Sequence, residues 1–218
     1  MESKTFSIAE ALRFGWRTTF RHFWLFVGVL LISGAVQLVP QVVSSLARER
    51  ALLTFAIMVV FAVLSMIVQM GIVNMTIRFA RDTEAHFADL FAVSHLFWKF
   101  LGASILYMLI IAGGMLLLIV PGIIWAIKYQ FFSYVIIDEG VGPLTALRRS
   151  GEITQGVKWN LLFFGILLGF INILGVLALF IGLFVTTPVT MLATAYVYRT
   201  LVSQTYGVQP EPVNPRKS

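Results

Sequence analysis

The chain has 218 residues, of which 59% are hydrophobic and 12% are charged, and it carries a net charge of +6 and no cysteine. Soluble domains average about 25% charged residues, so this composition excludes an ordinary soluble domain. The lack of cysteine excludes disulfide frameworks, thiolate nucleophiles and cysteine-ligated metals. The basic residues flank apolar segments, which favours anionic headgroups over nucleic acid as their partners. We expect no cofactor and no nucleic acid.

Six apolar segments are long enough, or nearly so, to cross a bilayer, which takes about 20 residues. They cover residues 22–40, 51–77, 100–120, 122–137, 159–179 and 183–203. The third and fourth join at Pro121-Gly122, which predicts a hairpin turn at the outer surface. The fifth and sixth are expected to turn near Gly182. The sequence thus predicts an all-α polytopic bundle of six transmembrane helices with about three interfacial amphipathic helices.

Positive charge is strongly asymmetric about these segments. Thirteen of the sixteen Lys and Arg residues lie in the N-terminal segment, the connections around 78–99 and 148–158, and the C-terminal end. The alternate connections hold only Arg48 and Arg50, and Lys128 lies within a span. The positive-inside rule therefore predicts a six-span protein with both termini in the cytoplasm.

A short amphipathic helix, a span and a return span are expected three times, over 6–77, 87–137 and 142–203. The first helix has the clearest signal, because Ser7 and Glu10 are spaced as a capping box. Pro143 suits the first turn of the third helix. An alternative is that any series of such hairpins looks repetitive. Residues 1–207 are expected to form one membrane domain, followed by a disordered tail at 208–218.

The polar faces of the first and third amphipathic helices are expected to contact lipid phosphates. The basic residues concerned are Arg13, Arg17, Arg21, Arg148, Arg149 and Lys158. A helix packed on a protein partner is the alternative for the first of them.

Four polar residues within the spans are candidates for a substrate path: Lys128, Gln69, Thr190 and Thr194. Charge inside a membrane favours a functional role. Helical periodicity instead puts Lys128 opposite Tyr129 and close enough to the outer surface to snorkel, or to stack on Trp125. We favour that interpretation for Lys128, and helix packing for the others. Gly165 and Gly169 have the spacing of a close-packing face.

Catalytic and metal motifs are weak. His22, His86 and His95 lack the spacing of a metal pair, and Asp138-Glu139 is interpreted as a solvated turn. No phosphate-binding glycine loop, nucleophile elbow or zinc-protease motif is present.

The segments 121–129 (PGIIWAIKY), 146–150 (ALRRS) and 156–159 (GVKW) carry a family resemblance. The chain resembles a broad group of uncharacterised bacterial six-span membrane proteins. This group includes the membrane domain attached to some glycerophosphoryl diester phosphodiesterases. The resemblance implies an integral membrane domain of unknown activity in a bacterial inner membrane. The apolar spans occupy most of the 218 residues and leave no room for the catalytic barrel, so no catalytic residue is carried over.

The leading functional hypothesis is a non-enzymatic membrane scaffold or accessory protein that contacts anionic lipid, with a partner protein or a second copy of the chain as further partners. The alternative is a small transporter or channel. A nearly uncharged midplane favours the scaffold, because transporters usually carry broken spans and midplane charges.

Overall fold

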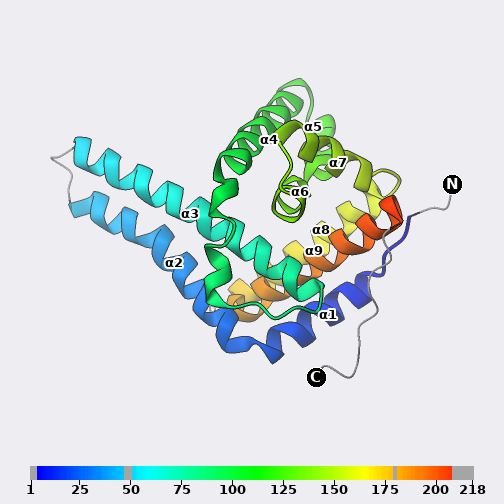
Figure 1. Cartoon of the computed structure of the whole chain (residues 1–218), viewed down its shortest axis with the longest axis horizontal. Helices are drawn as coiled ribbons and strands as arrows, with labels where there is room; N and C mark the ends of the chain where they lie inside the picture. The colour runs from blue at the N-terminus through cyan, green and yellow to red at the C-terminus, as the bar shows by residue number, and fades with distance from the viewer. Residues whose placement is uncertain (1–3, 47–50, 179–180, 208–218) are drawn as a thin grey trace.

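The computed structural model describes residues 4–46, 51–178 and 181–207, and every regular element within these ranges is a helix (Figure 1). The α-helices are α1 (Ile8–Arg21), α2 (Phe23–Leu46), α3 (Ala51–Ala80), α4 (Phe97–Leu117), α5 (Ile119–Tyr129), α6 (Phe132–Glu139), α7 (Pro143–Ile153), α8 (Lys158–Leu177) and α9 (Leu183–Tyr206). Two 3-10 turns, η1 (Phe87–Leu90) and η2 (Ser94–Leu96), precede α4. The all-α prediction is confirmed for the described residues. The tail at 208–218 lies outside them.

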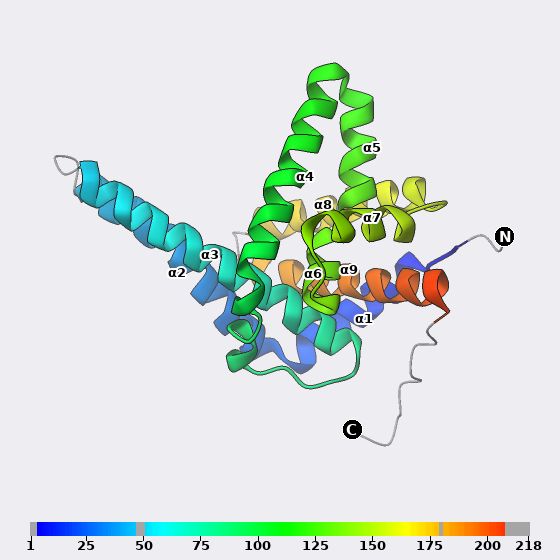
Figure 2. The same ribbon diagram turned by 45° about the horizontal axis from the view of Figure 1, so that its top comes forward.

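Two long antiparallel hairpins, α2–α3 and α4–α5, project from a shared base and diverge from one another (Figures 1 and 2). The base contains α1, α6, α7 and α9. Five segments are long and apolar enough to cross a membrane: Phe23–Val43, Leu52–Ala80, Phe87–Leu116, Ile119–Glu139 and Lys158–Leu177. These segments keep large apolar side chains exposed, as lipid-facing helices do. A multi-pass membrane protein follows from this finding.

The sixth predicted span, 183–203, corresponds to α9 and is not among these five segments. Its many Thr and Tyr residues lower its apolar character, and protein covers much of it: Leu192, Ala193, Val197, Tyr198 and Leu201 are buried. The predicted turn before it is confirmed, since Gly182 is the N-cap of α9.

Helix α1 runs antiparallel to α9 and packs along it. Gln204 exchanges hydrogen bonds with the backbone of Thr5 near one end, and a side chain on Gly15 would overlap the carbonyl oxygen of Val189 further along. The buried face of α1 is Ala11, Gly15 and Thr19. Helix α1 therefore buries this face on its own chain and leaves its arginines exposed.

The turn between α4 and α5 falls at Leu118, three residues before the predicted Pro121-Gly122 turn. Pro121 lies in the first turn of α5, where its missing N–H removes no helical hydrogen bond. Gly122 packs directly on Met115 and Gly114 of α4, so its small size brings the two helices together. The packing role of Gly122 is thus confirmed, whereas the position of the turn was wrong.

The fourth predicted span is broken. Helix α5 ends at Tyr129 and α6 begins at Phe132. Ser150 of α7 satisfies the backbone groups freed at this break. Its hydroxyl accepts from the Phe131 N–H at 3.1 Å and donates to the Lys128 carbonyl at 3.1 Å. The Thr154 hydroxyl donates to the same carbonyl at 3.0 Å. A break at this depth is tolerated because protein groups satisfy the freed backbone.

The second predicted amphipathic helix consists of the 3-10 turns η1 and η2. They pack on α3 at Gly71, where a side chain would overlap the backbone of Leu90. Asn74 donates to the Asp89 carbonyl at 3.1 Å, and Arg78 pairs with the Asp89 carboxylate at 2.9 Å. Short helix, long helix and return helix follow one another three times in the order of elements. The threefold repeat and the single-domain boundary stay predictions.

Candidate functional site

Polar contacts in the base join the segments that the charge pattern places on one side of the membrane. Asp138 at the end of α6 pairs with Arg81 after α3 and accepts from the Tyr198 hydroxyl of α9 at 3.2 Å. Lys99 of α4 donates to the Gly140 carbonyl at 2.7 Å. All the connecting segments predicted to be cytoplasmic, together with both ends of the described chain, therefore meet in one base.

Asp138 and Glu139 were predicted to form a solvated turn, and this was wrong. The Asp138 side chain is only 8% exposed in its ion pair with Arg81. Glu139 pairs with Arg149 of α7, and its side chain is 20% exposed. Adjacent carboxylates here anchor two neighbouring elements because successive residues of a helix point in different directions.

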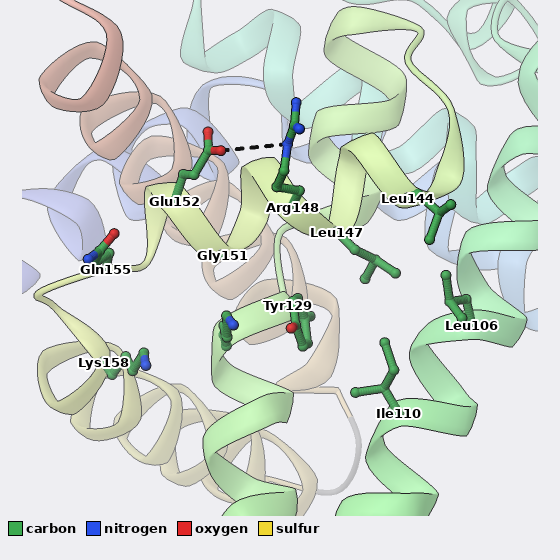
Figure 3. Close-up of a pocket in the computed structure, with 11 residues that line it drawn as sticks. Leu106, Ile110, Tyr129, Leu144, Leu147, Arg148, Gly151, Glu152, Gln155 and Lys158 are labelled. Carbon is green, nitrogen blue, oxygen red and sulfur yellow. Dashed lines mark ion pairs between the residues drawn. The ribbon is translucent and has the colours of Figure 1, made fainter.

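A pocket of about 590 Å³ opens between α4, α5, α7 and the start of α8 (Figure 3). Its apolar wall comes from Leu106 and Ile110 of α4 and from Leu144 and Leu147 of α7. Its polar lining is Lys128, Tyr129, Arg148, Gly151, Glu152, Gln155 and Lys158. The pocket is amphiphilic, and three of its side chains are cationic.

Lys128 lies near the C-terminal end of α5, where its side chain contacts α7. This corrects the prediction that it snorkels toward the outer turn. Its ammonium sits over the Tyr129 ring, 4.9 Å from the centroid, rather than on Trp125. Trp125 instead packs at Gly114 of α4. The Lys128 stem passes over Gly151, where a Cβ would lie 3.0 Å from its Cε. Lys128 and Tyr129 both line the pocket, since neighbouring residues of a helix point only about 100° apart.

Glu152 supplies the one carboxylate of the pocket lining. Glu152 forms an ion pair with Arg148 at 3.7 Å and accepts from the Tyr206 hydroxyl at 2.9 Å. Figure 3 shows the Arg148 and Glu152 side chains on the side of α7 away from Tyr129, whereas Lys158 extends toward Tyr129. Burial, and then the Glu152 hydrogen bond, raise the pKa of Tyr206. Within the described part of the chain, no carboxylate pairs with Lys128 or Lys158.

A second basic surface runs along α1. Arg13, Arg17 and Arg21 are exposed, and no described carboxylate pairs with them. Trp16 and Phe20 beside them are 55% and 52% exposed, and their rings stack at 4.9 Å. This pairing of free cations with exposed aromatic rings is typical of an interfacial helix.

Three other tryptophans share one position in the fold. Trp24, Trp98 and Trp159 are each the second residue of a long apolar helix, α2, α4 and α8 respectively. Each is at least 70% exposed. Tryptophan gathers at the headgroup level of bilayers, so these residues are consistent with one interface at the base.

The other predicted polar candidates are not brought together with Lys128. Gln69 is exposed on α3. Thr190 accepts from Asn172 of α8 at 3.3 Å, and Thr194 donates to the Thr190 carbonyl at 2.8 Å. None of these three side chains lines the pocket that contains Lys128. Thr190 therefore joins α8 to α9, whereas the hydrogen bond of Thr194 stays within α9.

Gly165 and Gly169 were predicted to mark a close-packing face. A side chain added at either would meet no described atom within 4 Å, so neither packs closely inside this chain. The small residues that bring α8 and α9 together are Gly175 and Gly182, which contact one another. The sequence spacing alone does not tell which of several glycines faces a neighbour.

No group of three or more His, Asp or Glu side chains that could hold a metal lies among the described residues. His22 stacks on Phe79 at 4.8 Å, while His86 and His95 are exposed. The structure describes no convergent set of acid, base and nucleophile around the pocket.

Sequence reasoning missed Ser150, Gly151 and Gln155. In the sequence, Ser150 belongs to the segment 146–150, which carries part of the family resemblance and suggests no role for its hydroxyl. Its hydrogen bonds to the α5–α6 break depend on contacts 19 and 22 residues away. Ser150 lies on the apolar side of an amphipathic helix, and a serine there indicates a buried hydroxyl that needs a hydrogen-bond partner.

Comparison with protein-family models, curated proteins and solved structures finds no match to this chain. The resemblance noted in the sequence stays a prediction.

Proposed function

We propose that this protein is a non-enzymatic membrane scaffold whose base contacts the anionic headgroups of the cytoplasmic leaflet. The observation that carries the proposal is the exposed surface of α1, where Arg13, Arg17 and Arg21 lie beside Trp16 and Phe20. Each basic residue near an anionic surface contributes about 1 kcal/mol.

The proposed orientation puts the base in the cytoplasm and the tips of the hairpins toward the outer face of a bacterial inner membrane. The positive-inside asymmetry and the three exposed tryptophans at the starts of α2, α4 and α8 support it. Helix α9 lies in this base, packed against α1, α3 and α8. A partner protein or a second copy would bind the exposed apolar hairpins.

Orientation is tested with single cysteines, because the chain has none of its own. Leu118→Cys at the α4–α5 turn should react with an impermeant thiol reagent on intact cells. Glu84→Cys in the base should react only after lysis. Both positions are exposed, so accessibility of the side chain is matched. Labelling of Glu84→Cys from outside would overturn the orientation.

Headgroup contact is tested by thermal unfolding of the full chain in nanodiscs of phosphatidylcholine, with and without phosphatidylglycerol. We expect the anionic lipid to stabilise the parent protein, and R13Q/R17Q/R21Q to lose most of that gain. R13K/R17K/R21K is the control that keeps the charge and should retain it. Equal stabilisation of all three proteins would refute the role of α1.

A transporter is the second candidate, because α5 and α6 form a broken span beside Lys128 and discontinuous helices are common at transport sites. Ser150 and Thr154 already occupy the freed backbone groups, so these groups are not free to bind a substrate. This favours the scaffold. Flux that is present in the parent and lost in a folded Lys128→Met variant would reverse that preference.

A further inference from the structure

We propose that the pocket between α4, α5, α7 and α8 binds one anionic amphiphile, with its phosphate between Lys128 and Lys158 and its acyl chain along Leu106 and Ile110. The inference rests on the proposed contact with anionic lipid and assigns a defined site to it. It does not involve the exposed arginines of α1.

The charge of the pocket calls for an anion. Lys128 and Lys158 line it without a carboxylate partner in the described structure. Glu152, the one acidic residue in the lining, is neutralised by Arg148 and held by the Tyr206 hydroxyl. Two ammonium groups at one cavity leave a positive potential that a phosphate would match.

The apolar side chains of the pocket walls favour an anion that carries an apolar tail. Leu106 and Ile110 lie one turn apart on α4, which belongs to a candidate membrane span. Leu144 on the α7 side is 74% exposed. A free inorganic anion would leave these apolar side chains uncovered, whereas an acyl chain would cover them.

The level of the pocket in the membrane favours a lipid headgroup. Lys158 opens α8 and precedes Trp159, which is 70% exposed at the proposed headgroup level. The pocket therefore lies where the phosphate of a membrane lipid resides, with the apolar α4–α5 hairpin extending from it (Figures 2 and 3).

Gly151 and the α5–α6 break shape the site. The Lys128 stem crosses α7 at Gly151, where a larger residue would displace it. The Lys128 carbonyl is fixed by the hydroxyls of Ser150 and Thr154, so the lysine backbone is held in place before a ligand binds. Such preorganisation lowers the entropic cost of binding.

The test is native mass spectrometry of the full chain in detergent, titrated with dioleoyl phosphatidic acid. We expect one saturable lipid per chain and no comparable binding of dioleoyl phosphatidylcholine, whose phosphate charge is balanced by choline. Lys128→Met and Lys158→Met should each weaken binding roughly tenfold to a hundredfold, the effect expected from losing a charge-assisted hydrogen bond. Lys128→Arg should retain most of the affinity.

Two controls keep the result decisive. Thermal unfolding without lipid should match the parent for Lys128→Met, and R13Q/R17Q/R21Q should leave the single tight site intact. If R13Q/R17Q/R21Q keeps the full stabilisation by anionic lipid while the parent still binds one phosphatidic acid, the proposed function alone is refuted. Equal phosphatidic acid binding by the parent and by folded Lys128→Met and Lys158→Met would refute the pocket. Inorganic phosphate that competes as strongly as the lipid binds would refute the acyl-chain contact.

Discussion

Helices α1 and α7 begin the first and the third sets of elements and show the same sequence pattern, yet the fold uses them differently. The arginines of α1 stay exposed, while its small face, Ala11, Gly15 and Thr19, is buried on α9. The arginines of α7 pair with carboxylates: Arg148 with Glu152 and Arg149 with Glu139.

The difference shows that a basic amphipathic pattern does not by itself assign its charges to lipid. The hydroxyls of Ser150 and Thr154 satisfy backbone groups at the α5–α6 break, and Arg149 pairs with Glu139 at the other end of α6. Arg149 is accordingly a structural residue, whereas the arginines of α1 and the two pocket lysines have no carboxylate partner among the described residues. The following substitutions test this distinction.

The largest effect is expected from Gly15→Leu. The added side chain would run into the Val189 carbonyl and force α1 away from α9. Overpacking of this kind costs about 3 kcal/mol. Equilibrium unfolding in mixed micelles measures the loss, with Gly165→Leu as the control because that position faces open space. An unchanged free energy of unfolding for Gly15→Leu would contradict the α1–α9 packing.

Ser150→Ala should cost about 2 kcal/mol, because it removes the partner of the buried Phe131 N–H and one donor to the Lys128 carbonyl. The same change at Ser7, the N-cap of α1, should cost about 1 kcal/mol. The same unfolding experiment compares them. If Ser7→Ala is the more damaging, the hydroxyl of α7 is not what stabilises the break.

The smallest effects separate the two sets of arginines. Arg149→Gln should lower the free energy of unfolding by about 0.5 kcal/mol, because the pair with Glu139 is partly exposed and screened by water. Arg17→Gln should change it by less than about 0.5 kcal/mol in neutral lipid. In anionic nanodiscs the order should reverse, with Arg17→Gln losing more stability. The same ranking in both lipids would remove the distinction between α1 and α7.

Local features of the fold could be predicted from the sequence. The Ser7 side chain accepts from the Glu10 N–H at 3.3 Å, which is half of the predicted capping box, while the Glu10 carboxylate accepts from the Tyr196 hydroxyl at 3.5 Å. Pro143 occupies the first turn of α7, as predicted. Five of the six predicted spans meet the length and apolarity of a membrane helix. These features depend on residues within one or two turns of each other, which the sequence displays directly.

The site could be predicted only in part. Lys128, Arg148 and Lys158 were each identified, but as members of separate surfaces. A helical projection of residues 122–137 put Lys128 opposite Tyr129, although neighbouring residues of a helix point only about 100° apart. The projection also assumed one continuous helix, whereas α5 ends at Tyr129. The break at Gln130–Phe131 and the crossing at Gly151 determine where Lys128 points.

Composition and charge asymmetry by themselves determined that this is an all-α, multi-span membrane protein, because length, apolarity and flanking charge act locally on each segment. The tertiary structure alone decided that α9 is covered by α1, that Arg149 is held by Glu139, and that two unpaired lysines share one pocket. Those outcomes depend on which helices meet. In apolar segments with little periodicity, that choice is made by long-range packing and by the few buried hydroxyls, glycines and ion pairs that it brings together.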